Sequence, residues 1–229
     1  MTLPNGVDTL EFDANFLGGP VWRTNSDTNL KQVLQAARHN KVRLLVCRTS
    51  VDDVTPDVLG FRNVEVLLTY ELPLGDSTGI PPEISVAEMP DADAVAAIAA
   101  SAFETDRWHA DPNIPDEAAN AFKAEWARNN VAGRADRVFI YRDDNGDILG
   151  FNACLLNGKK AIVDLIAVKA EARGRGIGAA LMRAVEGYYF DKVDVVSVGT
   201  QQRNSSSRRL YEALGYQKVM SRATWHWTP

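Results

Sequence analysis

The stretch that decides the fold reads VDLIAVKAEARGRGIG, residues 163–178. Its apolar start is typical of a strand, and glycines at 174, 176 and 178 then lead into an amphipathic helix. Alternate glycines let successive backbone N–H groups converge, and the helix start adds unpaired amides and a positive dipole end. The turn therefore predicts a diphosphate site, at which Arg173 and Arg175 either bind phosphate oxygens or face solvent.

Glycine-rich turns occur in several settings, which the surrounding residues help to distinguish. Glycines also serve helix caps and tight turns for structural reasons alone. A Walker loop is excluded, because no Lys-Ser/Thr pair follows the last glycine. A Rossmann fingerprint would normally follow the first strand of a parallel sheet. The turn by itself is therefore compatible with a purely structural role.

Two motifs together are similar to those of a known family. Arg173-Gly174-Arg175-Gly176-Ile177-Gly178 resembles the Gln/Arg-x-x-Gly-x-Gly/Ala motif of the GNAT acyltransferases, after a strand that ends in Ala-Val. Downstream, Thr200, Asn204, Tyr211 and Leu214-Gly215-Tyr216 resemble the second motif of that family. The resemblance implies the GNAT fold, an α/β fold with a mixed sheet, and acetyl-CoA as cosubstrate.

The resemblance also implies roles for individual residues. In the family the strand before the turn splays from its neighbour, so that Ile166, Ala167 and Val168 would hold pantetheine and Ile166 would polarise the thioester carbonyl. Asn204 and Tyr211 are seven residues apart and share a helix face, so Asn204 would contact pantetheine and Tyr211 would protonate the thiolate. Without the upstream motif, Tyr211 would be interpreted as a half-buried aromatic residue.

The general base has two candidates in the sequence. Asp164 lies two residues before Ile166 and is expected on the same strand face, where a carboxylate can act through a water. It also has a purely structural interpretation, as a hydrogen-bond acceptor. His109 is the second candidate, although a histidine in an exposed-looking loop is more often a surface residue. The sequence favours Asp164 slightly.

The chain is predicted to contain two parts. Residues 1–74 form a small N-terminal αβ domain, residues 75–82 a linker rich in turn residues, and residues 83–229 the GNAT domain with the order β-α-α-β-β-β-α-β-α-β. A helix at 29–39 and strands at 42–47 and 64–72 repeat the order seen at the end of the chain. We interpret the N-terminal part as a degenerate half-copy that kept the sheet and, with Pro56 where a helix would run, lost the cofactor helix. A chance similarity is the alternative.

Bulk properties exclude several classes of function. The 229 residues carry a formal charge of −5 without a dominant basic block, so no nucleic-acid or membrane partner is expected. Cys47 and Cys154 lie in apolar runs and are expected to be buried thiols, and no metal site is expected. With no signal segment at the start, the expected location is cytoplasmic. The sequence leaves a homodimer open.

The acceptor amine is suggested by a narrower resemblance. Residues 11–18, 101–107, Trp126 and 200–211 look like GNAT enzymes that acetylate dTDP-linked 4-amino-4,6-dideoxyhexoses. Phe16, Arg107, Trp108 and His109 are then candidate substrate contacts, each of which has a core or surface role as its alternative. The sequence also allows other acceptors, such as an aminoglycoside, a polyamine or a protein N-terminus. A further alternative is that the protein is a non-catalytic sensor that binds acyl-CoA.

Overall fold

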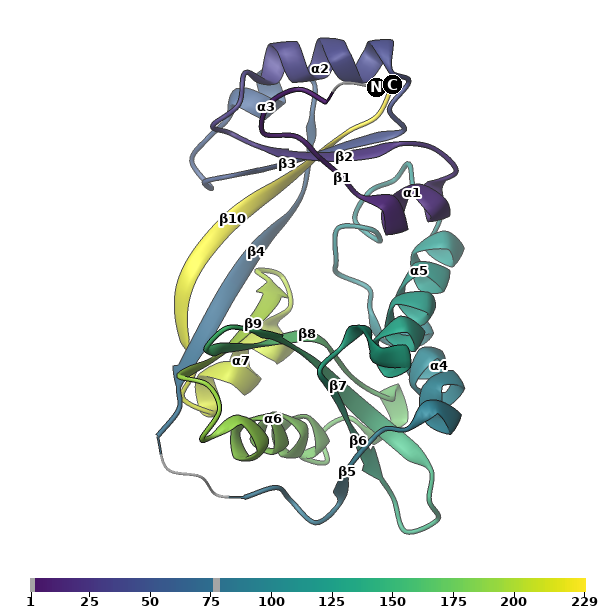
Figure 1. The fold of residues 1–229 in the computed structure, drawn as a ribbon, viewed down its shortest axis with the longest axis vertical. Coiled ribbons are helices and arrows are strands. Elements are labelled where there is room, and N and C mark those ends of the chain that lie inside the picture. The colour runs from purple at the N-terminus through teal and green to yellow at the C-terminus, as the bar shows by residue number, and fades with distance from the viewer. Residues whose placement is uncertain (1–2, 76–78) are drawn as a thin grey trace.

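A computed structural model describes residues 3–75 and 79–229, which form a continuous mixed sheet with helices packed against it (Figure 1). Its strands are β1 (Asp8–Thr9), β2 (Val21–Asn25), β3 (Leu44–Thr49), β4 (Arg62–Pro73), β5 (Ile84–Val86), β6 (Arg137–Arg142), β7 (Ile148–Asn157), β8 (Lys160–Val168), β9 (Val195–Gln201) and β10 (Gln217–Trp227). Their order across the sheet is β1-β2-β3-β10-β4-β9-β8-β7-β6-β5. The α/β class predicted from the sequence is confirmed.

The helices are α1 (Glu11–Leu17), α2 (Leu30–His39), α3 (Thr55–Val58), α4 (Ala92–Ala102), α5 (Asp116–Asn129), α6 (Ile177–Tyr189) and α7 (Ser205–Ala213). Short helical turns occupy Met89–Asp91, Asn130–Arg134 and Ala170–Ala172. On α2 the predicted apolar stripe is buried, and the Asn29 side chain caps the helix by accepting from the Gln32 N–H. A single-turn helix, α3, keeps Pro56 in its first turn, at a position where the sequence predicted that the helix was lost.

The long strands β4 and β10 join the upper and lower parts of the molecule (Figure 1). Strand β10 pairs antiparallel with both β3 and β4, and β4 pairs in turn with β9. Thus β4, the last strand of the N-terminal half, lies against β9 of the C-terminal half. In the same way β10, the last strand of the C-terminal half, lies against β3 of the N-terminal half. Because β2 and β3 are parallel, as are β8 and β9, the strand order supports our proposal of a degenerate half-copy.

The two predicted domains share more than a sheet. One apolar cluster combines Val21 and Leu44 of the N-terminal half with Trp108 and Phe122 of the C-terminal half. Of the predicted linker, residues 76–78 lie outside the described residues. The division at 75–82 therefore stays a proposal about sequence organisation, and the burial of apolar surface crosses it.

Two predictions concern the chain as a whole. Both cysteines are free and buried, as predicted. Within the ranges 3–75 and 79–229, no helix is long and apolar enough to cross a membrane. These residues also contain no group of three or more potential metal ligands.

Candidate active site

Strands β8 and β9 part halfway along their length. Their parallel register runs from Lys160–Val195 to Val163–Val198 and ends there, while β8 continues to Val168 against β7. Beyond Val198, β9 stays paired with β4 as far as Gln201. The last residues of β8 thus have a strand on one side only, so the predicted splay is present.

The backbone of β8 alternates between its two sides. The Lys169 N–H donates to the Leu149 carbonyl at 2.9 Å, so Lys169 faces β7. By alternation Ala167 also faces β7, whereas Ile166 and Val168 present their N–H and carbonyl groups to the open side. Consistent with this, the Val168 carbonyl accepts a bond from Arg173 Nε at 3.3 Å. The Ile166 N–H therefore lies on the open side of β8, and its role toward the thioester carbonyl stays a prediction.

The glycine turn closes the end of this region. Gly174 and Gly176 have φ values of 79° and 81°, which L residues rarely adopt, and a Cβ on either would meet nothing within 4 Å. Ile177 starts α6 and is buried in the core. At Gly178 a Cβ would lie 3.1 Å from Leu210 Cδ2, so this glycine permits the close approach of α6 and α7. Backbone geometry accounts for the first two glycines and packing accounts for the third.

The two arginines of the turn differ in placement. Arg173 donates to the carbonyls of Val168 and Ala102 and lines the large cavity at the end of β8. Its side chain therefore links the turn to the end of α4. Arg175 is exposed and lies outside the cavity lining, which agrees with its solvent-facing alternative.

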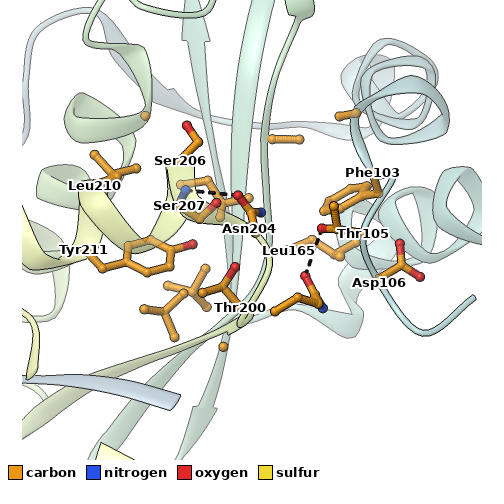
Figure 2. A pocket seen from close by; sticks show the side chains of 18 of the residues that line it. Phe103, Thr105, Asp106, Leu165, Thr200, Asn204, Ser206, Ser207, Leu210 and Tyr211 are labelled. Carbon is orange, nitrogen blue, oxygen red and sulfur yellow. Dashed lines mark hydrogen bonds between the residues drawn. The ribbon is translucent and has the colours of Figure 1, made fainter. Parts of the chain in front are cut away.

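Helix α7 carries the second motif. Asn204 caps the helix, because its Oδ1 accepts from the Ser207 N–H at 3.1 Å. Tyr211 is 2% exposed and points toward the side of the cavity where Thr200 and Asn204 lie (Figure 2). Burial raises the pKa of Tyr211 above its ordinary value, and a hydrogen bond with Ser207 acts in the opposite direction. The phenol is therefore protonated at neutral pH, the form that can donate a proton.

A cavity of about 820 Å³ connects these parts. Its lining includes the end of β8, the glycine turn, Asn204 and Tyr211 on one side, and residues of β3, β4, α5 and the loop after α4 on the other. Figure 2 shows Phe103, Thr105 and Asp106 facing the α7 residues across this space. The volume is within the range of sites that hold a cofactor and a small substrate.

Asp164 does not share a strand face with Ile166, so that expectation is wrong. The register shifts at this point, with Cys154 opposite Val163 and Ala153 opposite Leu165, so Asp164 is the extra residue of a β-bulge. Its Oδ2 accepts from Trp126 Nε1 at 2.7 Å, Asn130 Nδ2 at 2.8 Å and Arg134 Nη1 at 2.6 Å. Ile166 packs instead with the cluster around α6. The contacts of Asp164 occupy its Oδ2 and agree with a structural role for that oxygen, whereas Oδ1 makes a 3.4 Å contact with Arg134 Nη2.

The side chain of His109 is only 7% exposed and contacts two polar neighbours, so it is not a free surface residue. Its Nδ1 lies 2.8 Å from Asp106 Oδ2 and its Nε2 lies 3.0 Å from Asn120 Oδ1, which suits a doubly protonated ring. The bond with Asp106 raises the pKa of His109, against the effect of burial. Burial acts to raise the pKa of Asp106, but His109 and Lys123 hold it at about 2. His109 lies outside the cavity lining, whereas Asp106 and Lys123 are part of it.

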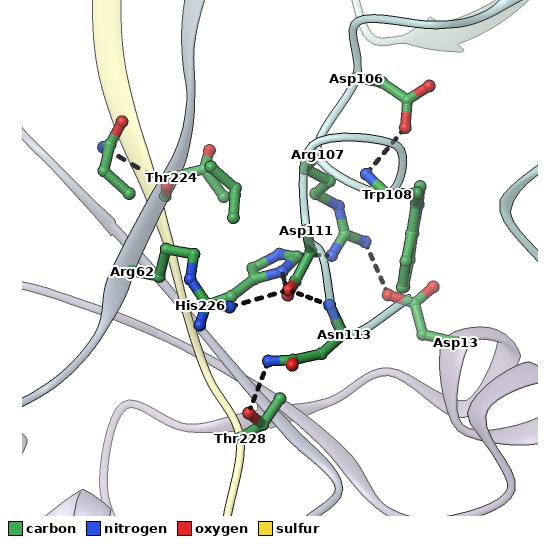
Figure 3. A network of polar contacts seen from close by, with 12 residues as sticks. Asp13, Arg62, Asp106, Arg107, Trp108, Asp111, Asn113, Thr224, His226 and Thr228 are labelled. Atoms are coloured by element: carbon green, nitrogen blue, oxygen red, sulfur yellow. Dashed lines mark hydrogen bonds and ion pairs between the residues drawn. The ribbon is translucent and has the colours of Figure 1, made fainter. Parts of the chain in front are cut away.

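Of the other predicted substrate contacts, two line the cavity. Arg107 donates to Asp13 Oδ2 at 2.7 Å and stacks on Trp108, with 4.0 Å from its guanidinium carbon to the ring centroid (Figure 3). Trp108 is 1% exposed, and both residues line the cavity. Phe16 packs against Phe122 at a centroid distance of 5.3 Å and is not part of the lining. Its placement agrees with the core alternative.

The loop that carries these residues is tied to both halves of the chain (Figure 3). Asp111 is buried and accepts from His226 Nδ1 at 2.8 Å and from Arg62 Nη1 at 3.1 Å. Asn113 donates to the Thr228 hydroxyl at 3.1 Å. Residues of both halves of the chain therefore hold this loop in place beside the cavity.

Comparison with known proteins decides the family. The model of the acetyltransferase (GNAT) family matches residues 98–216, more than half of the chain. The chain belongs to the GNAT family. The spore coat polysaccharide biosynthesis protein SpsD of Bacillus subtilis (strain 168) is 33% identical to this GNAT chain over 166 residues. The match covers 71% of this chain and 57% of SpsD, so the chain spans less than two thirds of that relative.

Solved structures agree on the GNAT fold. A GCN5-related N-acetyltransferase from Kribbella flavida has a TM-score of 0.65 at 17% identity, over 100% of this chain and 88% of that chain. A tandem GNAT protein from the clavulanic acid biosynthesis pathway has a TM-score of 0.60 at 16% identity, over 92% of this chain and 76% of that chain. Both likenesses extend beyond residues 98–216, so the N-terminal half is also part of the shared fold.

Sequence reasoning missed several residues of the GNAT cavity. Arg48 and Glu65 reach it from β3 and β4, and Lys123 reaches it from α5. Burial lowers the pKa of Lys123, while the Asp106 carboxylate opposes that change. The available signals were a single arginine at the end of an apolar strand and a lysine on the buried face of a helix, next to Phe122.

Proposed function

We propose that this protein transfers the acetyl group of acetyl-CoA to the amino group of a nucleotide-linked amino sugar. One observation carries the acetyl transfer. A buried tyrosine, Tyr211, lines the same cavity as the open edge of β8 and the glycine turn. Family membership supports the same reaction class. A cytoplasmic location is part of this proposal, whereas a homodimer stays a prediction.

The residues of the cradle fit the cofactor. Bound acetyl-CoA would supply a thioester as the acetyl donor. The N–H groups of Ile166 and Val168 are positioned to bind pantetheine, and Ile166 is assigned to the thioester carbonyl. The open space over Gly174 and Gly176 lets phosphate oxygens approach backbone N–H groups next to the positive end of α6.

Proton transfer is assigned to two side chains. Tyr211 stays protonated because it is buried, and it donates to the departing thiolate. Asp164 stays our proposal for the group that accepts the proton of the amine, through a water. Its Oδ1 makes only a 3.4 Å contact with Arg134, while its other oxygen is occupied by three donors.

The acceptor is proposed from two observations. SpsD carries a name from polysaccharide biosynthesis. A cationic acceptor such as a polyamine would need unpaired carboxylates in the cavity, and four acidic residues near the loop after α4 are the candidates. Asp106 lines the cavity but is paired with His109 and Lys123. Asp111 is buried with His226 and Arg62, and Asp116 and Glu117 lie outside the lining. Because Asp106 and Asp111 are paired and Asp116 and Glu117 lie outside the lining, these four carboxylates do not favour a polyamine.

The test is a calorimetric titration with acetyl-CoA followed by measurement of CoA release. The acceptors to compare are dTDP-linked 4-amino-4,6-dideoxyhexoses, aminoglycosides and polyamines. Release with the sugar nucleotide alone supports the full proposal. Release with another amine alone keeps the transferase and replaces the acceptor. Saturable binding without release from any of these amines would indicate a sensor, and no binding would overturn the proposal.

A further inference from the structure

One cation in the cavity has no partner in the described chain. Arg48 ends the apolar run of β3 and lines the cavity. Within the ranges 3–75 and 79–229 its guanidinium group forms neither an ion pair nor a hydrogen bond, and its Nε is buried. The other cations on that side are paired, Arg107 with Asp13 and Lys123 with Asp106. A buried donor left unpaired is costly, so a partner from a ligand would stabilise it.

The surroundings of Arg48 are rich in positive charge. Burial lowers the pKa of Arg48, Arg107 lowers it further, and Arg23 and Arg222 contribute in the same direction. Glu65 opposes them. That carboxylate is already occupied, because it accepts from Gln201 Nε2 at 3.0 Å and from the Thr224 hydroxyl at 3.2 Å. A multivalent anion is the ligand that relieves repulsion among several arginines.

The position of Arg48 suits the far end of an acceptor. Strands β10 and β4 separate β3 from β9, where Thr200 and Gln201 line the cavity. Three strand spacings amount to roughly 14 Å. A hexose between its amine and its diphosphate, together with an extended arginine, spans this distance. The loop that carries Arg107 lines the same cavity.

We propose that Arg48, with Arg107, forms a binding site for the diphosphate group of the acceptor. This inference rests on the proposed acetyl transfer and adds the residue that selects an anionic acceptor. It assigns a role in substrate choice to the N-terminal half, which carries no glycine turn of its own between β2 and α2. Guanidinium groups bind phosphate oxygens in a bidentate manner, which a lysine does not reproduce.

The test uses protein saturated with acetyl-CoA, so that the diphosphate site of the cofactor is already filled. Inorganic pyrophosphate and dTDP are then titrated into the wild type, Arg48→Met, Arg48→Lys and Arg43→Met by calorimetry. Arg43 is exposed, lies next to β3 and is not part of the cavity lining, so its variant removes the same charge elsewhere. Thermal unfolding and acetyl-CoA affinity report whether each variant is folded.

We expect Arg48→Met to weaken both ligands about 10- to 100-fold, with Arg48→Lys in between and Arg43→Met within about twofold of the wild type. Equal affinity of Arg48→Met and the wild type would overturn the inference, as would the absence of saturable binding to the wild type. If acetyl-CoA itself fails to bind, the proposed function fails. A loss of pyrophosphate affinity specific to Arg48→Met would still establish the anion site.

Discussion

Replacing Tyr211 by Phe separates catalysis from packing. The change removes one hydroxyl group and keeps a ring that lies 5.9 Å from Tyr70 and 6.1 Å from Tyr216. Loss of the hydrogen bond with Ser207 costs about 1 kcal/mol of stability. Loss of a general acid lowers kcat by about 100- to 10,000-fold, which corresponds to roughly 3 to 5 kcal/mol. The effect on the rate should therefore exceed the effect on stability.

The assay compares CoA release and acetyl-CoA affinity for the wild type and two variants. Tyr216→Phe is the matched control, because Tyr216 is 3% exposed and donates to Glu186 at 3.0 Å but does not line the cavity. It should lose about 1 kcal/mol of stability with kcat unchanged. With an acetyl thioester of a more acidic thiol, the deficit of Tyr211→Phe should shrink, because that thiolate needs less assistance from an acid.

Two results would refute the role assigned to Tyr211. The first is a kcat for Tyr211→Phe within twofold of the wild type. The second is a loss of kcat that is independent of the acidity of the leaving thiol. A fall in acetyl-CoA affinity as large as the fall in kcat would assign the residue to binding instead.

Three further changes have defined outcomes. Gly176→Ala forces a residue with a side chain to φ near 81°, so it should destabilise the turn by about 1 to 3 kcal/mol. It should also weaken acetyl-CoA binding measured by calorimetry. Unchanged acetyl-CoA affinity would contradict the phosphate role of the turn. Gly178→Ala places a methyl group 3.1 Å from Leu210 Cδ2, so the temperature of unfolding should fall; an unchanged value would mean that α7 shifts freely. Asp106 has its pKa lowered to about 2, so its stabilising effect is complete above its unfolded-state pKa of about 4 and is lost as pH falls toward 2. Asp106→Asn should therefore cost about 2 kcal/mol in denaturant unfolding at pH 7, with a difference from the wild type that narrows between pH 4 and pH 2. A constant difference over that range would refute the pairing.

Local patterns in the sequence were sufficient for most elements. The helix predicted at 29–39 follows from apolar spacing, and the structure confirms it as α2 with Asn29 as its cap. The glycine turn was equally visible, because positive φ values demand glycine at 174 and 176. These features depend on residues that are close together in the chain.

Contacts between distant segments could not be predicted in this way. The bulge at Asp164 arises from the register with β7, and one extra residue reverses the face that each later side chain occupies. Arg48 reaches the cavity because β10 pairs with both β3 and β4 and so joins β3 to the rest of the sheet. The core role of Phe16, a candidate substrate contact in the sequence, depends on Phe122 of α5, which is more than a hundred positions away. The Asp164 bulge, the position of Arg48 and the packing of Phe16 all depend on contacts between distant segments.

The insertion of β10 between β3 and β4 has a consequence for the folding of the chain during its synthesis. During translation the N-terminal residues emerge first, but the edge of β3 acquires its neighbour only when Gln217–Trp227 has been made. Until then β3 has unpaired backbone groups that invite contact with other chains, and the apolar cluster around Leu45 and Cys47 lacks Trp225 and Trp227. Completion of the first half must wait for the last strand, so synthesis and folding proceed in different orders.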